Sequence, residues 1–217
     1  MQAIKSIEAL EAHYGKVSPL AISKVCEHIT PLYQRWIDAS RFMILSTVGP
    51  SGTDASPRGD SDEVVRIVDA KTLWLPDWKG NNRLDSLKNI VEDGRVSAMF
   101  MVSGSDTVVR INGEAIVTAD DVITGAFERD GKLPCTVTVI TVGEVYFQCA
   151  KALMRSGLWQ AGDASAGLPT AGSCCRNKRQ NLQRRVMTTA IHNTLRSVFG
   201  RRAGRRASLL GVIALIV

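Results

Sequence analysis

The chain lacks the short signatures of the commonest nucleotide and metal sites. No segment reads Gly-x-Gly-x-x-Gly or ends a loop in Gly-Lys-Ser/Thr, so neither a dinucleotide loop nor a nucleoside-triphosphate loop is predicted. The histidines His13, His28 and His192 share no ligand spacing, which predicts no metal site. The five cysteines form no Cys-x-x-Cys pair, and no apolar leader opens the chain, so we expect a cytoplasmic protein with reduced thiols.

Acidic residues are absent after Asp163, although ten basic residues follow it. The residues up to Asp163 comprise 17 basic and 21 acidic residues, so the excess positive charge of the chain lies entirely in the segment after Asp163. We therefore do not expect a nucleic-acid partner for the globular part. Two explanations of the basic tail stay open. Either a change of reading frame near Ser173 replaced another ending, or the tail is a genuine appendage that contacts anionic lipid or nucleic acid. No apolar run, including 209–217, has the length of a bilayer span.

The chain divides by pattern into a helical lead-in (1–40), a β-rich domain (41–160) and an atypical basic tail (161–217). In the lead-in, one helix is expected from Ile4 to near Gly15, and Ser-Pro and Thr-Pro pairs begin two more at Pro19 and Pro31. Trp36 and Ile37 are expected to face inward.

The middle of the chain alternates short apolar runs with turn residues. Strands are predicted at 41–48, 53–57, 63–69, 72–75, 95–102, 107–118 and 135–149, the last broken at Gly143, and short helices are predicted from Leu84, over 119–128 and over 150–155. Successive hairpins with few crossovers favour a barrel over a doubly wound parallel sheet. The predicted fold class is therefore mainly β with flanking helices (α+β).

One segment has the composition of a phosphate site. An apolar strand stops at Pro76, a loop with Lys79, Asn81, Asn82 and Arg83 follows, and a helical pattern begins with Ser86 in its first turn. The first backbone N–H groups of a helix have no internal partner, and the helix dipole favours an anion there. An ordinary strand-to-helix turn with solvated charges remains the alternative.

The surrounding motifs give this segment a context. Residues 56–60 (SPRGD), 64–69 (VVRIVD), 94–100 (GRVSAMF), 106–115 (DTVVRINGEA) and 146–159 (YFQCAKALMRSGLW) occur in this order. Together they resemble the pyridoxamine 5'-phosphate oxidase-like family of FMN-binding split β-barrels, over roughly 41–159. The resemblance implies an FMN cofactor held between two subunits, and hence a symmetric homodimer. A deazaflavin or haem is the alternative ligand.

The resemblance also assigns roles to individual residues. It implies that Arg58 is a second phosphate cation and that Pro76 and Asp77 lie along the flavin ring edge. Arg110 matches an Arg-x-Asn-Gly segment, and Lys151 lies in a region near the flavin of the neighbouring subunit. The sequence assigns no catalytic residue.

The implied activity is FMN-dependent oxidoreduction with NAD(P)H or a small organic molecule as substrate. A non-catalytic flavin carrier or redox sensor is the second reading. The chain departs from true pyridoxamine phosphate oxidases because no Arg-x-His pair occurs near its end. We therefore do not expect it to oxidise vitamin B6.

Overall fold

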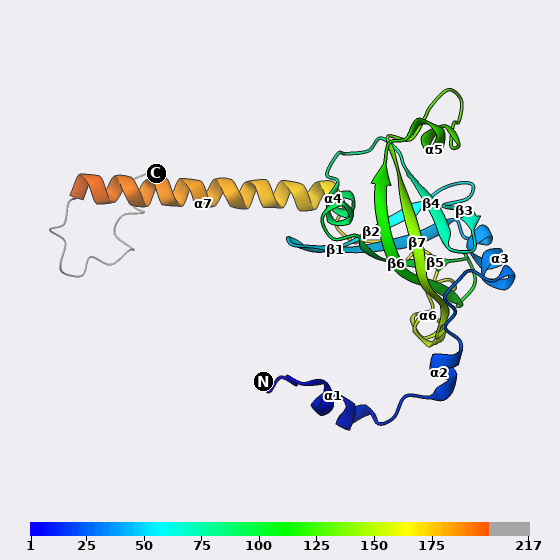
Figure 1. Ribbon diagram of the computed structural model, residues 1–217. Coiled ribbons are helices and arrows are strands. Elements are labelled where there is room, and N and C mark those ends of the chain that lie inside the picture. The colour runs from blue at the N-terminus through cyan, green and yellow to red at the C-terminus, as the bar shows by residue number, and fades with distance from the viewer. Residues whose placement is uncertain (200–217) are drawn as a thin grey trace. The chain divides into compact units, whose positions relative to one another are not determined.

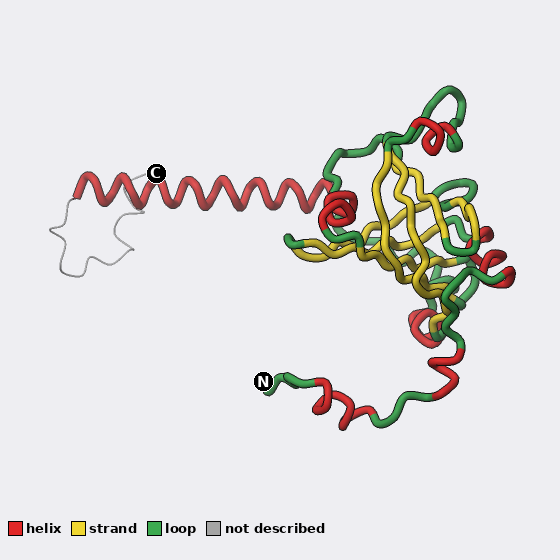
Figure 2. Tube along the Cα trace, in the orientation of Figure 1, coloured by secondary structure: helices red, strands yellow, loops and turns green. Residues whose placement is uncertain are grey.

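The computed structural model describes residues 1–199, and for Leu20, Arg184, Arg185 and residues 191–199 it describes only the backbone. Two units are distinguished, one of Met1–Gly162 and one that begins at Asp163. The first unit holds one seven-stranded sheet in the order β2-β1-β5-β6-β7-β4-β3, in which every neighbouring pair is antiparallel. Figures 1 and 2 show this curved sheet with short helices at its margins, which confirms the predicted mainly β fold with flanking helices.

The three predicted hairpins are present and account for six strands. They are β1 (Phe42–Gly49) with β2 (Gly52–Gly59), β3 (Arg66–Asp69) with β4 (Thr72–Asp77), and β5 (Arg95–Met101) with β6 (Val108–Thr118). The seventh strand, β7 (Thr136–Gln148), lies between β6 and β4. Strand β7 thereby joins the β3–β4 hairpin to the rest of the sheet.

The predicted break of the last strand at Gly143 is wrong. Strand β7 continues through this position, and the register shifts between Asn112 and Gly113 so that Gly143 is left without a partner, as in a β-bulge. A side chain at Gly113 would place its Cβ 2.0 Å from the Thr141 carbonyl oxygen, so only glycine fits there. A β-bulge within a continuous strand therefore lies where the end of a strand was predicted.

Other boundaries also differ from the prediction. Strand β2 ends at Gly59 rather than at 57, and β4 does not stop at Pro76, because Pro76 and Asp77 pair with Val137 and Thr136 of β7. Strand β3 begins at Arg66 rather than at Glu63, since pairing with β4 starts at Arg66 opposite Trp74, and the Glu63 side chain accepts a hydrogen bond from the Arg66 guanidinium at 3.0 Å. Helix α5 (Asp121–Gly125) ends before Glu128, because Phe127 turns into the interior, where only 2% of it is exposed. The segment between β6 and β7 is therefore mostly loop.

The lead-in contains helices α1 (Ile7–Tyr14), α2 (Pro19–Ser23) and α3 (Pro31–Ala39). Helix α1 begins at Ile7 rather than at Ile4 because the Ser6 hydroxyl accepts a hydrogen bond from the Ala9 N–H and caps the helix. The expected inward direction of Ile37 is confirmed by its exposure of 1%. Trp36 is half-buried and lies edge-on to the Phe147 ring.

Helix α4 (Asp85–Glu92) packs on the β1–β2 hairpin. The buried Asn89 amide donates to the Thr47 hydroxyl of β1 at 3.1 Å. A Cβ at Gly49 would lie 2.5 Å from the Asn89 side-chain oxygen, so glycine allows this close approach. These contacts hold α4 against β1, and the Ser86 hydroxyl joins its first turn to Asp54 of β2.

Helix α6 (Lys151–Ser156) follows β7, and the second unit contains the long helix α7 (Ala171–Phe199). No helix within residues 1–199 is both long and apolar enough to span a bilayer. The arginines at 201, 202, 205 and 206 and the apolar run 209–217 lie outside the described residues.

Candidate functional site

A cavity of about 630 Å³ lies where three segments of the first unit meet. Its walls come from β2, from the loop between β4 and α4 with the first turn of α4, and from the start of β7. Seven residues predicted from the sequence to bind a cofactor line it: Arg58, Asp77, Lys79, Asn81, Asn82, Arg83 and Ser86. Residues that lie far apart in the sequence, on β2, between β4 and α4, and at the start of β7, thus line one cavity.

The N-terminus of α4 opens onto this cavity without a side-chain cap. The N-cap residue is Leu84, whose φ of 62° is left-handed and whose side chain accepts no hydrogen bond. Asn82, two residues earlier, also has a positive φ of 58°. Non-glycine residues with this backbone conformation are uncommon and cluster at functional sites. Within the described chain, no capping acceptor serves the first N–H groups of α4, so they are available to an anion.

The cavity carries three cations and three carboxylates. Arg58 Nη1 lies 2.5 Å from Asp77 Oδ2, and Arg83 pairs with Asp85. Asp54 is the third carboxylate, and its Oδ2 accepts a hydrogen bond from the Ser86 hydroxyl at 2.5 Å. Lys79 is exposed, and the described residues offer it no ion pair. Lys79 and the α4 N-terminus are therefore the positive groups of the cavity wall that lack an acidic partner among the described residues, and Asp54 is the carboxylate that lacks a basic one.

Two buried polar atoms in the cavity wall lack partners. The Nε of Arg58 and the Oγ1 of Thr136 are inaccessible and make no hydrogen bond with any described residue. A buried polar atom without a partner costs about 1–3 kcal/mol, so such atoms are usually satisfied by water or a ligand. Asp77 occupies Nη1 of Arg58, and no described residue accepts a hydrogen bond from the rest of the guanidinium fork, so a shift of this side chain would be enough to present it to a phosphate or a ring oxygen.

Three predicted ligands lie away from this cavity. Pro76 is buried in β4 opposite Val137, beyond the residues of β4 that pair with β3. The guanidinium carbon of Arg110, on β6, lies 5.4 Å from the Tyr146 ring centroid, and Nη1 donates to Gln148; its Nε is buried and has no hydrogen-bond partner among the described residues. Lys151 is exposed at the start of α6. One chain does not bring these residues to the cavity.

The cavity also contains residues that the sequence patterns did not single out. Asp54 and Thr136 lie on strands far apart in the chain, Cys135 is exposed beside Asp77, and Trp78 directly follows Asp77. The Cys135 N–H donates to the Asp77 carbonyl at 2.9 Å and so joins the start of β7 to the end of β4. Of these four residues, only Trp78 lies within the segment that the sequence predicted to be a phosphate site. An aromatic residue next to a basic loop is the pattern that could have identified it.

A comparison with family models decides the relationship of the chain. The sequence model of pyridoxamine 5'-phosphate oxidase matches residues 29–149, which is more than half of the chain. The chain belongs to the pyridoxamine 5'-phosphate oxidase family. The antiparallel seven-stranded sheet with flanking helices is accordingly the predicted split β-barrel of that family.

Solved structures resemble the chain only weakly. A HupZ variant from Group A Streptococcus is 18% identical with a TM-score of 0.47, covering 55% of this chain and 99% of its own. General Stress Protein 26 from Bacillus anthracis is 13% identical with a TM-score of 0.40, covering 52% and 88%. An FMN-binding protein from Syntrophomonas wolfei is 14% identical with a TM-score of 0.40, covering 66% and 97%. No curated protein matches significantly, so the family assignment rests on the family model.

Proposed function

We propose that this chain binds FMN in the cavity between β2, the β4–α4 loop and the start of β7. The observation that carries the proposal is the uncapped α4 N-terminus beside Lys79 and the partly unsatisfied Arg58. An anion there would satisfy free N–H groups and meet two cations. Membership in the pyridoxamine 5'-phosphate oxidase family supports FMN as the source of that anion.

The residues present fit the needs of a flavin. Its phosphate would lie at the α4 N-terminus with Lys79 and Arg58, and the Asn81, Asn82 and Arg83 loop would border it. The cavity volume of about 630 Å³ is within the range of small-molecule sites. Asp77 would lie toward the ring, where the buried Thr136 hydroxyl still needs a partner. Bound FMN supplies hydride and electron transfer, and the protein residues bind and orient it.

A titration with two flavins tests the assignment of the phosphate end. Riboflavin carries the same ring without the phosphate, so FMN should bind at least tenfold more tightly if the α4 N-terminus and its cations hold a phosphate. Flavin fluorescence measured against protein concentration gives both affinities. Equal affinities would show that the phosphate is not held here, and binding of neither flavin would reject the flavin assignment.

We further propose that the bound flavin makes the protein an oxidoreductase. Hydride transfer to a flavin needs no acid–base pair from the protein, because that chemistry belongs to the cofactor. Anaerobic mixing of the FMN-loaded protein with NADH and NADPH tests this. Bleaching of the flavin absorbance by either nucleotide supports the enzyme, and persistence of the oxidised spectrum with both favours the non-catalytic carrier or sensor.

A further inference from the structure

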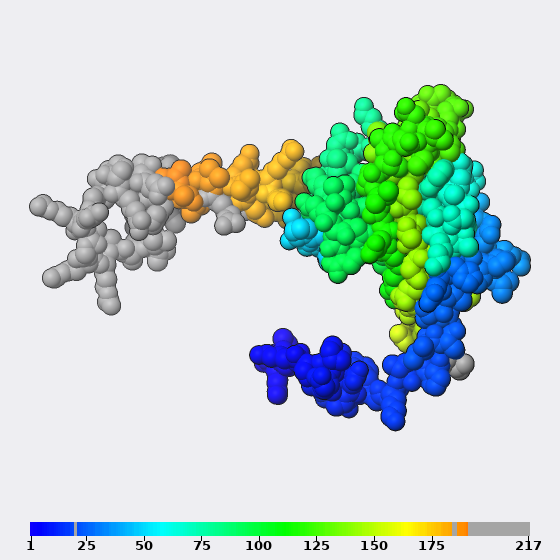
Figure 3. Space-filling view, viewed as in Figure 1, coloured from blue at the N-terminus to red at the C-terminus, as the bar shows by residue number. Residues whose placement is uncertain are grey.

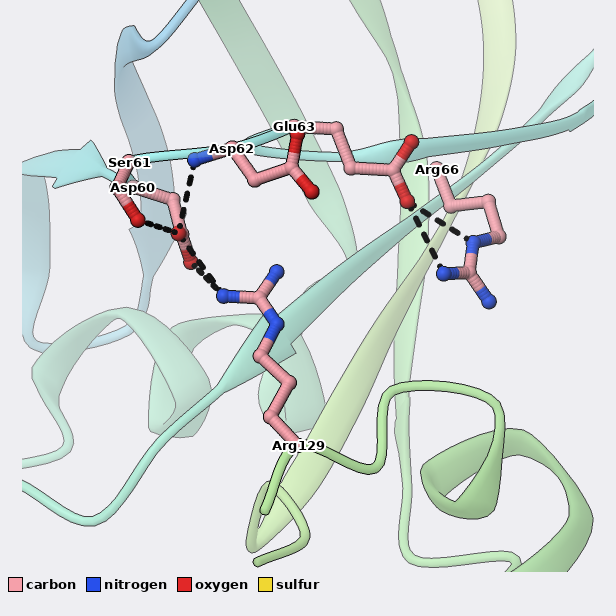
Figure 4. Close-up of polar contacts among 6 residues, drawn as sticks. All are labelled: Asp60, Ser61, Asp62, Glu63, Arg66 and Arg129. Atoms are coloured by element: carbon pink, nitrogen blue, oxygen red, sulfur yellow. Dashed lines mark hydrogen bonds and ion pairs between the residues drawn. The ribbon is translucent and has the colours of Figure 1, made fainter.

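The loop between β6 and β7 is attached to the β2–β4 region at two separate arginines. Arg66, which opens β3, donates from Nη1 to the Ala126 carbonyl at 2.6 Å, and its guanidinium carbon lies 4.5 Å from the Phe127 ring centroid. Arg129 makes the second attachment, from the loop side to Asp60 at the end of β2. Figure 4 shows both arginines with their carboxylates, and Figure 3 shows the loop in green against the cyan and teal β3–β4 segment.

The second attachment is locally rigid at both ends. Nη1 of Arg129 lies 2.9 and 2.8 Å from the two carboxylate oxygens of Asp60, whose side chain is 16% exposed. The Asp62 N–H at 3.2 Å and the Ser61 hydroxyl at 3.4 Å also donate to this carboxylate (Figure 4). The Asp60 end of the pair is therefore held by its own turn before it meets Arg129.

The backbone that carries Arg129 is fixed by a tight turn. Arg129 and Lys132 exchange two backbone hydrogen bonds of 3.0 and 2.9 Å. The two residues between them, Asp130 and Gly131, both have positive φ values of 51° and 74°, which is characteristic of a type I′ turn. The Gly131 N–H also donates to the Glu128 carboxylate. The closed turn thus fixes the backbone position from which the Arg129 side chain extends.

The Arg129 guanidinium also contacts a residue of the cavity wall. Its central carbon lies 5.5 Å from the centroid of the Trp78 ring, within the range of a cation–π contact. Trp78 lines the cavity between Asp77 and Lys79, whereas Arg129 itself does not line it. An indole has two rotatable bonds, and a cation on one side limits the directions in which it extends.

We propose that Arg129, held by Asp60, is a positioning residue that fixes Trp78 as a wall of the cavity. This inference rests on the proposed binding of FMN and deepens it. Trp78 then offers a fixed aromatic surface to the planar ring of the flavin, and the β6–β7 loop becomes part of the cofactor site although it does not touch the cofactor. Arg66 anchors the same loop without contacting Trp78, so the two anchors differ in function.

The two anchors provide a matched pair of variants. Arg129→Gln and Asp60→Asn each break the contact that orients Trp78, and Arg66→Gln breaks the other anchor of the same loop. Binding of FMN and the visible circular dichroism of the bound flavin are measured for each full-length variant. The dichroism reports how the ring is oriented within its chiral site, which a general loosening of the loop would alter equally in all three.

The expected result separates Arg129 from Arg66. Arg129→Gln and Asp60→Asn should raise the Kd for FMN about two- to tenfold, because a Trp78 side chain without its cation has to be ordered when FMN binds, and should diminish the flavin dichroism. Arg66→Gln should leave both unchanged. Trp78→Leu should reproduce the change in dichroism, and adding Arg129→Gln to it should produce no further change, because the two residues act through one contact.

The outcomes distinguish this inference from the proposed function. A wild-type protein that binds FMN, together with an Arg129→Gln variant whose dichroism and Kd match those of Arg66→Gln, overturns the role of Arg129 alone. A further loss when Arg129→Gln is added to Trp78→Leu also overturns it. A wild-type protein that binds no FMN rejects the proposed function, and the positioning role is rejected with it.

Discussion

Arg58 is the side chain on which the proposed phosphate site depends most at the residue scale. It is 22% exposed, its Nη1 is held by Asp77, and its buried Nε has no partner in the described chain. Arg58→Ala should weaken FMN binding by about 1.5–3 kcal/mol, the usual range for a hydrogen bond to a charged group, or roughly 10- to 150-fold in Kd. Fluorescence titration with FMN measures this loss directly.

The control for Arg58→Ala is the removal of an arginine that lies outside the cavity. Arg95 forms an ion pair with Asp93, two residues away, in the same way that Arg83 of the cavity wall forms one with Asp85. Arg95 itself does not line the cavity. Arg95→Ala should leave the Kd for FMN unchanged. If the two variants bind FMN equally well, Arg58 does not contact the phosphate.

The Asp60 carboxylate gives a pH-dependent test of the Arg129 contact. Its partial burial raises the pKa of Asp60, but the Asp62 N–H and the Arg129 guanidinium outweigh that effect, and the folded-state pKa lies below the ordinary 3.8. A carboxyl with a lowered pKa stabilises the fold above its unfolded pKa and loses that stabilisation as the pH falls through the folded value. The unfolding free energies of wild type and Asp60→Asn should therefore converge as the pH falls through 3.8 and further below it.

Urea denaturation at several pH values measures this convergence. Asp62→Asn is the matched control, because Asp62 is exposed and its carboxylate accepts no hydrogen bond from the described residues. It removes an exposed carboxylate from the same turn and leaves the Asp60–Arg129 ion pair in place. A constant difference for Asp60→Asn would show that the ion pair with Arg129 does not contribute to stability.

Single residues were predictable where a local sequence pattern defines their role. The basic loop at 79–83 and Ser86 could be assigned to one site because strand, loop and helix follow one another in the chain. Asp54 and Thr136 could not be assigned, because their place in the cavity depends on how β2 and β7 are brought together in the sheet. The role of Arg129 depends likewise on a contact 69 residues away in the chain.

At the scale of elements, helix α4 connects the fold to the site. Its buried residues Ser86, Asn89 and Ile90 fasten it to the β1–β2 hairpin, and this attachment aims its uncapped N-terminus into the cavity. The position of α4 should therefore affect stability and cofactor binding together.

Gly49→Ala tests the attachment of α4. The added Cβ would lie 2.5 Å from the Asn89 side-chain oxygen and 3.2 Å from the Asn89 Cα, so the helix has to shift. Overpacking of this kind costs about 1–3 kcal/mol of stability, and we expect a lower Tm and weaker FMN binding. Gly125→Ala is the control, since a Cβ there meets nothing within 4 Å and alanine favours the helix. Equal behaviour of the two variants would contradict the account of α4.

The order of the strands and helices was predicted from the sequence more accurately than the residues at which they begin and end. Alternating apolar runs with turn residues gave the three hairpins in their correct order, because each hairpin is a local structure. The pairing of β7 with both β6 and β4 and the bulge at Gly143 are long-range features. A glycine within an apolar run marks an irregularity, but the run alone does not distinguish a bulge from a break.

At the scale of the whole molecule, the account predicts a homodimer. Arg110 and Lys151 match the family pattern yet lie away from the cavity of their own chain, which is expected if they serve the site of a second copy. Sedimentation analysis should give a mass of twice 23.6 kDa. A monomer that nevertheless binds FMN would show that one chain forms the site and that Arg110 and Lys151 have no part in it.

The visible absorption spectrum of the purified protein, after loading with FMN and removal of the excess, decides whether the cavity binds FMN. We expect one flavin to be retained per chain, with absorption bands shifted from those of free FMN because the ring has left water for a protein cavity. The Arg58→Ala protein should lose this flavin during the same wash. A wild-type protein that emerges colourless, at a sedimentation mass showing that the dimer has formed, would contradict the assignment of the cavity to FMN.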